Sequence, residues 1–181
     1  MTVNFTAKFL TDTYIPTRLP NGDYVPNCVS IVELDKNNTN DMRAVLETTT
    51  NWDKNGGKFG RNIYSQMKNP DYDAGIKTER YIALTTQTAD FDKLKPQYIQ
   101  GLMILSKNYY EQNELSWLET NPQIVNAEKG KKPYKCVGTS LVNFAKQECK
   151  QGGIYVIPAI NAVEFYKKLG FKVKKMNLLT R

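Results

Sequence analysis

The sequence of 181 residues contains no histidine. This absence excludes Ser-His and Cys-His nucleophilic catalysis, because both mechanisms need an imidazole to carry the proton. It also excludes histidine-ligated zinc sites and general acid–base catalysis by imidazole. Any catalytic acid or base must therefore be Glu, Asp, Tyr, Lys, Cys or a chain terminus, and we expect no metal site.

Cysteines and long apolar runs are also scarce. The three cysteines, Cys28, Cys136 and Cys149, are odd in number and show no C-x-x-C spacing, which argues against a disulfide framework or a zinc knuckle. The first residues lack the basic start and long apolar run of a signal peptide. The longest mainly apolar stretch, residues 154–160, is too short to span a bilayer. We expect a cytoplasmic protein with no membrane contact.

The composition is that of a folded domain with a basic end. The chain is 40% hydrophobic and 24% charged, with a formal net charge of +7, which predicts one domain over residues 1–181. Residues 126–181 hold 12 Lys and Arg but 3 Asp and Glu, a net charge of +9. This bias indicates either an anionic partner, such as nucleic acid, a phosphorylated cofactor or an acidic surface, or simply a solvated basic face.

Hydrophobic periodicity predicts a mixed α/β layout without internal repeats. The first 24 residues, with Pro16, Pro20 and Asn21-Gly22, are expected to be rich in turns. Asp41 is expected to cap a helix that ends before Asn51-Trp52. Further helical segments are expected around residues 63–67, 138–150 and 162–169, and strands at residues 28–34, 80–86, 98–106, 114–119, 154–157 and 171–179.

One loop has the features of a phosphate site. It follows the strand at residues 114–119 and leads into the helix at residues 138–150, with the sequence KKPYKCVGTS over residues 131–140. A helix start offers free backbone N–H groups and the positive end of the helix dipole. We therefore expect the amides of residues 136–140 to hold a pyrophosphate, with Lys135 and its neighbours attracting it. An ordinary turn before a helix is the alternative.

Two segments together resemble a known family. The sequence AVEFYKKLGF at residues 162–171 resembles the A-x-x-F-Y-x-x-L-G-F signature of the GNAT superfamily of N-acetyltransferases. The sequence YKCVGTSLV at residues 134–142 resembles that family's acyl-CoA pyrophosphate loop, written [QR]-x-x-G-x-[GA]. The two segments stand in the family's order. The resemblance implies a GNAT-like fold: a mostly antiparallel sheet with one parallel, splayed strand pair and flanking helices.

The resemblance also implies a chemistry. An amine would attack the thioester of acetyl-CoA directly, and the pantetheine arm would lie between residues 115–119 and 154–157. The tyrosine of the F-Y pair, Tyr166, would protonate the leaving thiolate; its ordinary pKa of about 10 is close to that of a thiol. Glu119, at the end of its strand, is the expected base, acting through water. Glu79, Glu111 and Glu114 are the other candidates for the base.

The chain departs from the family pattern at three positions. Cys136 stands where the first glycine of the loop is usual, and Pro133 where Gln or Arg is usual. Ala159 stands where an asparagine often contacts the pantetheine arm, and Asn161 lies two residues further on. With these departures, the expected cofactor-binding residues are Leu118, Lys135, Cys136, Val137, Gly138, Thr139, Ser140 and Asn161.

Three functions remain open at this point. The first is an acetyl-CoA-dependent N-acetyltransferase. The second is a catalytically impaired, CoA-binding module on the same fold. The third is a basic RNA-associated binding module that contacts RNA or tRNA through the C-terminal third. The acceptor is undetermined among small amines, antibiotics, peptide N-termini, protein lysines and charged tRNA, and so is the oligomeric state.

Overall fold

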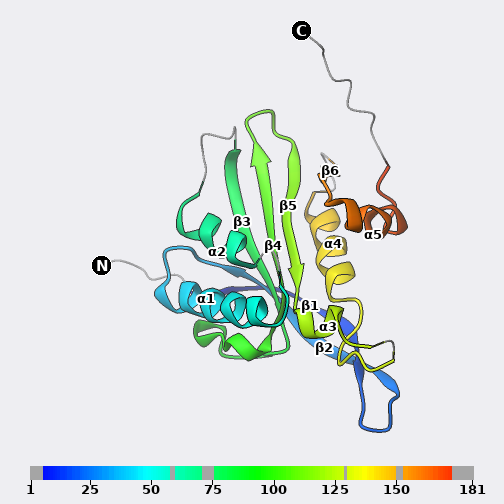
Figure 1. Cartoon of the computed structure of the whole chain (residues 1–181). Coiled ribbons are helices and arrows are strands. Elements are labelled where there is room, and N and C mark those ends of the chain that lie inside the picture. The colour runs from blue at the N-terminus through cyan, green and yellow to red at the C-terminus, as the bar shows by residue number, and fades with distance from the viewer. Residues whose placement is uncertain (1–5, 58–59, 71–75, 129, 150–152, 173–181) are drawn as a thin grey trace.

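The chain folds into a six-stranded sheet with helices on both faces (Figure 1). The computed structural model describes residues 6–57, 60–70, 76–128, 130–149 and 153–172. The strands are β1 (Lys8–Arg18), β2 (Tyr24–Leu34), β3 (Ile76–Thr85), β4 (Ile99–Asn108), β5 (Asn113–Thr120) and β6 (Ile154–Tyr155). The helices are α1 (Thr39–Lys54), α2 (Gly60–Lys68), α3 (Pro122–Val125), α4 (Val137–Glu148) and α5 (Val163–Lys168), with short 3₁₀ turns at Phe91–Lys93, Pro96–Tyr98 and Ile160–Ala162.

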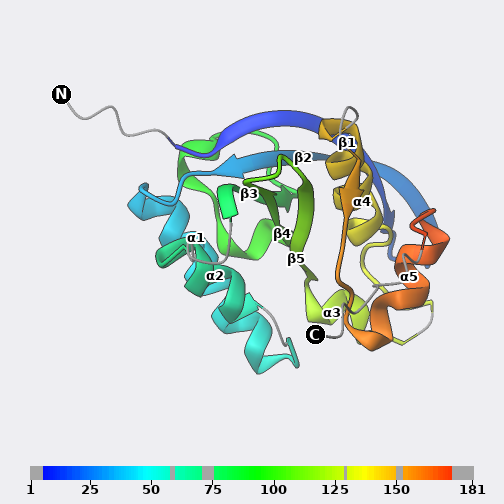
Figure 2. The ribbon, with the colours of Figure 1, turned by 90° about the horizontal axis from the view of Figure 1, so that it is seen from above.

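The sheet order is β1-β2-β3-β4-β5-β6. The pairs from β1 to β5 are antiparallel, and β5 pairs with β6 in parallel. Helices α1 and α2 cover one face, and α4 covers the other (Figures 1 and 2). The expected mixed sheet, mostly antiparallel with one parallel pair and flanking helices, is confirmed. Every described helix is too short or too polar to traverse a bilayer.

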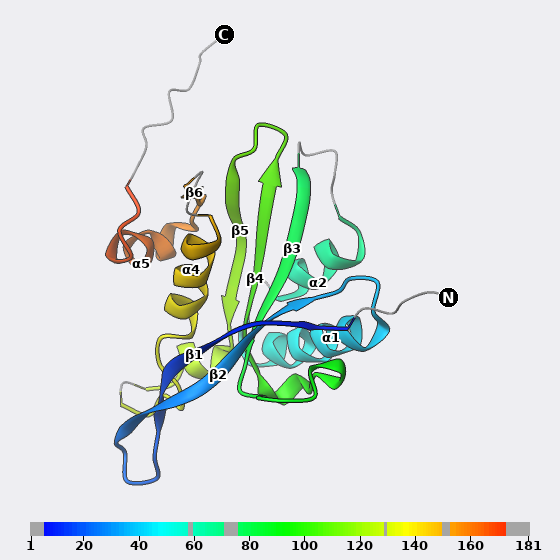
Figure 3. The same ribbon diagram turned by 180° about the vertical axis from the view of Figure 1, so that it is seen from behind.

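The N-terminal expectation was wrong in part. The turn expected among the first 24 residues is confined to the link between two long strands, in which the Leu19 amide donates to Asp23 O at 2.8 Å. Before it lies β1, an edge strand in which only Ile15 is buried. In Figure 3 the β1–β2 hairpin runs diagonally across the front of the other strands, and its turn projects beyond them.

Helix α1 also differs from the expectation at both ends. Its N-cap is Asn38, whose side chain accepts from the amides of Asn40 and Asp41. Asp41 is instead fully buried in the first turn, where its carboxylate accepts the Asp35 amide at 2.9 Å. The helix continues through Trp52, which is only 4% exposed, because this side chain completes the apolar face against the sheet. Strand β6 is shorter than expected, and the strand expected at residues 171–179 lies almost wholly outside the described residues.

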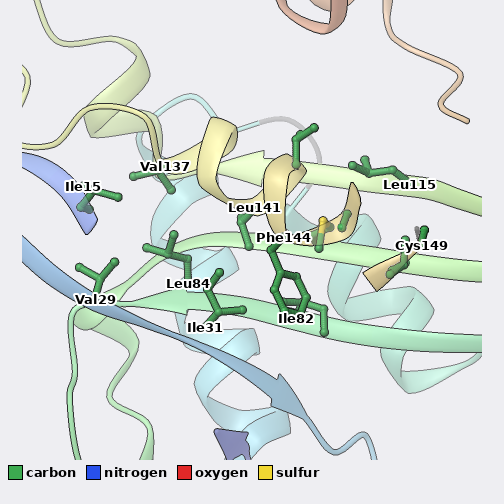
Figure 4. Close-up of a cluster of buried hydrophobic side chains, with 14 of the residues drawn as sticks. Ile15, Val29, Ile31, Ile82, Leu84, Leu115, Val137, Leu141, Phe144 and Cys149 are labelled. Carbon is green, nitrogen blue, oxygen red and sulfur yellow. The ribbon is translucent and has the colours of Figure 1, made fainter. Parts of the chain in front are cut away.

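Two apolar layers hold the helices to the sheet. One lies between the sheet, α4 and α5 and includes Ile31, Ile82, Leu84, Leu141 and Phe144 (Figure 4). The other lies beneath α1 and α2 and includes Trp52, Ile63 and Met67. Burial of these side chains is the main source of stability, at about 25 cal/mol per Å² of apolar surface.

A glycine sets how closely α4 approaches the sheet. A Cβ on Gly101 of β4 would lie 2.7 Å from Leu141 Cδ1 and 2.8 Å from Val137 Cγ1. Only a residue without a side chain allows this contact. Because Val137 is the first residue of α4, the same contact fixes where the helix begins relative to β4 and β5.

Candidate functional site

The two parallel strands separate and leave a cleft between them. Among the described residues they pair only at Asn113 with Ile154 and at Glu114 with Tyr155; β5 then continues to Thr120, paired with β4 but not with β6. The cleft has a volume of about 840 Å³. It is lined by residues 115–120 of β5, residues 156–159 after β6, residues 134–139 at the start of α4, and Ala162, Phe165 and Tyr166 from the following turn and α5, with Gly56, Gly57, Pro122, residues 124–126, Lys132 and Asn161 completing the wall.

The side of the cleft formed by β5 contains a bulge. On β4, Leu105 pairs with Leu115 and Ile104 pairs with Trp117, so Ser116 has no counterpart on β4. The Ser116 hydroxyl donates instead to Ser106 Oγ at 2.8 Å. A bulge bends the strand and re-aims the side chains and amides on either side of it. Ser116, Trp117 and Leu118 consequently all line the cleft.

The start of α4 presents free amides at one end of the cleft. The first helical bond runs from the Ser140 amide to Cys136 O at 2.8 Å. The amides of Val137, Gly138 and Thr139 precede that bond and have no acceptor among the described residues. All three residues line the cleft. The structure therefore brings together Cys136 to Thr139, whereas Ser140, with its amide used by the helix, does not line the cleft.

Cys136 occupies a conformation that favours glycine. It is the N-cap of α4, with φ of 62° and ψ of 13°, and its thiol is exposed. A non-glycine residue in the left-handed region costs roughly 1 kcal/mol. This cysteine therefore adopts the backbone geometry expected of a loop glycine, and the chain turns sharply into the helix without one.

Two lysines of the loop before α4, Lys132 and Lys135, are held by protein contacts. The Lys135 ammonium lies 3.3 Å from the centre of the Tyr24 ring. The backbone amide of Lys135 donates to Pro16 O at 2.9 Å. The Lys132 ammonium donates to Val125 O at 3.3 Å. Both residues line the cleft. Their charges therefore bias this end of the cleft toward anions from fixed positions.

Tyr166 extends from α5 into the wall of the cleft. It is 7% exposed and makes edge contacts with the rings of Phe165 and Phe171, at centroid distances of 5.0 and 5.5 Å. Burial raises the pKa of the Tyr166 phenol to about 12. Within the described residues the hydroxyl has no hydrogen-bond partner, and Tyr166 lines the cleft.

Glu119 lines the same cleft from β5. Its Oε2 is buried and lies at the start of α2, where a Cβ on Gly60 would come within 3.0 Å of it. A helix start favours a negative charge. Leu118, on the same strand, is half-buried, and Asn161 is exposed in the turn Ile160–Ala162. The structure thus brings every expected site residue except Ser140 to one cleft.

The other candidate bases lie elsewhere. Glu111 is paired with Lys77 and Lys107, and these contacts lower its pKa to about 2. Glu79 accepts from the Tyr81 hydroxyl at 2.6 Å, and Glu114 accepts from the Tyr155 hydroxyl at 2.7 Å. These three carboxylates do not line the cleft. Among the described residues, no group of three or more Cys, Asp or Glu could hold a metal ion.

Some cleft residues were missed by the sequence reasoning. Trp117 packs against the apolar layer beneath α1 and α2, as its place on a strand of the sheet leads one to expect, and it also lines the cleft. Tyr134 and Phe165 also line it. Three other aromatic residues do not line the cleft: Trp52 of α1 is buried against the sheet, and Tyr109 and Tyr110 are exposed at the β4–β5 turn. Only for Phe165 did the sequence give a hint that the residue lines the cleft, because it forms the F-Y pair with Tyr166.

Comparisons with known proteins give structural neighbours only. No family model and no curated protein matches the sequence. Over 84% of its length the chain is similar to a predicted acetyltransferase from Clostridium acetobutylicum whose crystal structure contains acetyl-CoA, with a TM-score of 0.47, 10% identity and 96% of that chain covered. It is also similar, again over 84%, to an acetyltransferase from Trypanosoma brucei, with a TM-score of 0.48, 15% identity and 99% of that chain covered. A likeness at these TM-scores and identities supports no role for any individual residue of this chain.

Proposed function

We propose that the protein transfers an acetyl group from acetyl-CoA to a primary amine by direct attack. The observation that carries this proposal is the separation of β5 from β6, which opens a cleft ending at the free amides of α4. Residues of both segments that resemble GNAT motifs line this cleft. An end with free helix amides and a mostly apolar lining suit a pyrophosphate joined to a pantetheine arm.

The chain offers a distinct contact for each part of the cofactor. The amides of Val137, Gly138 and Thr139 would hold the pyrophosphate, because they converge at the positive end of the α4 dipole. From Leu115 onward, β5 has hydrogen-bonding groups on the edge that no described strand covers. The amide groups of a pantetheine arm can bond to this edge like an added strand. Leu118 and Asn161 lie on either side of that path.

In this proposal two side chains move protons. In the proposed reaction the amine nitrogen attacks the carbonyl carbon of the thioester, and the carbon–sulfur bond then breaks. Glu119 accepts the proton lost by the amine, through water. Tyr166 gives its proton to the leaving thiolate, and the phenol is reprotonated from solvent. Because burial raises its pKa to about 12, the Tyr166 phenol stays protonated at neutral pH. This pKa is further from that of a thiol than the pKa of an ordinary tyrosine is.

Titration calorimetry with acetyl-CoA tests the binding step. Gly138→Asp and Gly138→Asn form a matched pair, because their side chains have similar shapes and differ in charge. A Cβ at Gly138 would make only ordinary contacts, 3.4 Å from Phe165 Cζ and Thr120 Cγ2. A negative charge beside the bound pyrophosphate should make acetyl-CoA binding about tenfold weaker in Gly138→Asp than in Gly138→Asn. Asp in the first turn favours helix formation, so weaker binding would not reflect unfolding.

Mass spectrometry tests the transfer step and identifies the acceptor. The protein would be incubated with acetyl-CoA and with panels of amines, peptides and tRNA, and products would be searched for a mass increase of one acetyl group. Absence of acetyl-CoA binding to the unsubstituted protein would contradict the proposal as a whole. Binding with no transfer to any acceptor would favour a second candidate function, a cofactor-binding module. The observation in favour of this second function is the mismatch between the pKa of the Tyr166 phenol and that of a thiol.

A further inference from the structure

The loop before α4 is attached to the projecting β1–β2 hairpin (Figure 3). Thr17 forms an isolated antiparallel bridge with Tyr134. On either side of this bridge, the Arg18 amide donates to Pro133 O and the Lys135 amide donates to Pro16 O, each at 2.9 Å. The last residues before Cys136 are thus paired to β1 like a short extra strand, although more than a hundred residues separate them in sequence.

Side chains of the hairpin hold the same loop from its other side. The Tyr24 hydroxyl donates to Lys132 O at 2.8 Å, and the ring of Tyr24 lies beneath the Lys135 ammonium. The Arg18 side chain donates through Nε to Gly130 O at 2.9 Å. Tyr24 contacts both lysines that line the cleft: it bonds to the backbone carbonyl of Lys132 and packs against the side chain of Lys135.

Tyr24 itself does not line the cleft. Its effect on a bound molecule must therefore pass through the loop. The opposite side of the α4 start is already fixed by the contact of Val137 with Gly101. The hairpin supplies the second support, and between these two supports lie Cys136 and the free amides that follow it. The cost of ordering this loop is then met on folding rather than on binding, which favours affinity.

We propose that Tyr24 is a positioning residue for the phosphate end of the cleft, holding Lys132 and Lys135 so that the amides at the start of α4 converge on an anion. This inference rests on the proposed function, in which that anion is the pyrophosphate of acetyl-CoA. It extends the site to the β1–β2 hairpin, which the sequence motifs do not include.

Two substitutions at Tyr24 separate its contacts. Tyr24→Phe removes the hydrogen bond to Lys132 O and keeps the ring beneath Lys135, whereas Tyr24→Leu removes both. Loss of one hydrogen bond should weaken acetyl-CoA binding about fivefold, and loss of both contacts about tenfold or more. The Michaelis constant for acetyl-CoA should rise by the same factors, while kcat at saturating acetyl-CoA stays within twofold. A residue needed only for folding would lower the active fraction and leave the Michaelis constant unchanged.

Tyr14→Leu is the matched control. Tyr14 lies on the same hairpin, is 68% exposed and does not line the cleft, so this variant should bind acetyl-CoA as the unsubstituted protein does. Amide hydrogen exchange without ligand gives an independent readout: the Lys135 and Arg18 amides should exchange faster in Tyr24→Leu and not in Tyr14→Leu. If the unsubstituted protein binds acetyl-CoA and Tyr24→Leu binds it equally well, the positioning role is wrong. If the unsubstituted protein does not bind it, the proposed function fails and this role fails with it.

Discussion

Gly60 and the carboxylate of Glu119 are in close contact across the α2–β5 boundary. A Cβ on Gly60 would lie 3.0 Å from Glu119 Oε2 and 3.1 Å from Cβ and Cγ2 of Thr49. The first residue of α2 therefore limits where this carboxylate can stand in the cleft. Glu119 is held by the fold, on β5 and against a helix start, rather than exposed at a strand end.

Gly60→Ala should lower the transfer rate by moving Glu119. The added methyl group must displace the carboxylate, or Thr49, by a few tenths of an ångström, and misplacement by about 1 Å can cost about a hundredfold in rate. We expect kcat to fall severalfold, with acetyl-CoA affinity within twofold of the original. Steady-state kinetics and calorimetry measure the two quantities. Glu119→Gln removes the base and is the reference variant, with an expected loss of kcat of at least about a hundredfold. A Gly60→Ala variant with full activity would show that the contact between Gly60 and Glu119 does not position the base.

Tyr166→Phe should lower turnover more than cofactor affinity. The substitution removes one hydroxyl and keeps the ring contacts with Phe165 and Phe171. General acid catalysis contributes about 10² to 10⁴ in rate, and we expect the lower value because a phenol with a pKa of about 12 is a weak donor to a thiolate. Single-turnover acetyl transfer and calorimetry separate chemistry from binding.

The pH profile gives a second test of Tyr166. A raised pKa keeps the phenol protonated until the pH approaches about 12, so ionisation of Tyr166 should cause no fall in rate up to pH 10. The Tyr166→Phe variant should be slower than the unsubstituted protein at each pH in this range. Equal rates of the two proteins at all pH values would remove Tyr166 from the acid role.

Cys136→Gly should stabilise the protein. Glycine adopts a φ near the observed 62° without steric strain, so relief of this strain should raise the free energy of unfolding by about 0.5–1 kcal/mol. Cys136→Ala is the control, because it removes the thiol and keeps the strain. Denaturant unfolding of the three proteins measures the difference. A Cys136→Gly protein no more stable than Cys136→Ala would show that the left-handed conformation costs this chain little.

The central elements could be predicted from the sequence because their burial is periodic or continuous. Strand β4 is buried from Ile99 to Ser106, and α4 places its apolar residues at helical spacing, so each leaves a clear local pattern. Strand β1 leaves no such pattern. It is an edge strand with one buried side chain and with Pro16 near its end, and it is held in place by its pairing with β2. The helix cap was misplaced because Asn38 and Asp41 are both good capping types, and only burial of Asp41 separates them.

The sequence predicted most residues of the candidate site but not the contacts and strand geometry that position them. The pairing of two motifs indicated which segments meet, and Glu119, Tyr166 and Gly138 do line one cleft. The contact of Lys135 with Tyr24 depends on a hairpin more than a hundred residues away, which no local pattern reveals. The placement of Trp117 depends on a one-residue bulge, which reverses the side to which the following residues of the strand point.

The buried carboxylate of Asp41 should make the stability of the fold depend on pH. Burial raises its pKa from 3.8 to about 6 in the folded protein, so the folded state binds a proton more tightly than the unfolded state does. The stability contributed by this proton is fully present below about pH 4 and is lost as the pH rises through about 6. The difference is on the order of 3 kcal/mol.

Asp41→Asn should remove this dependence. The amide oxygen of asparagine can still accept the Asp35 amide, and it carries no charge at any pH. Urea unfolding at pH 4, 5, 6 and 7 should show a fall in stability for the unsubstituted protein and a flatter profile for Asp41→Asn, with Asp92→Asn, at an exposed position, as the control. If the slope between pH 4 and 6 is the same in Asp41→Asn as in the unsubstituted protein, another group carries the dependence, because a neutral side chain cannot release a proton in that range.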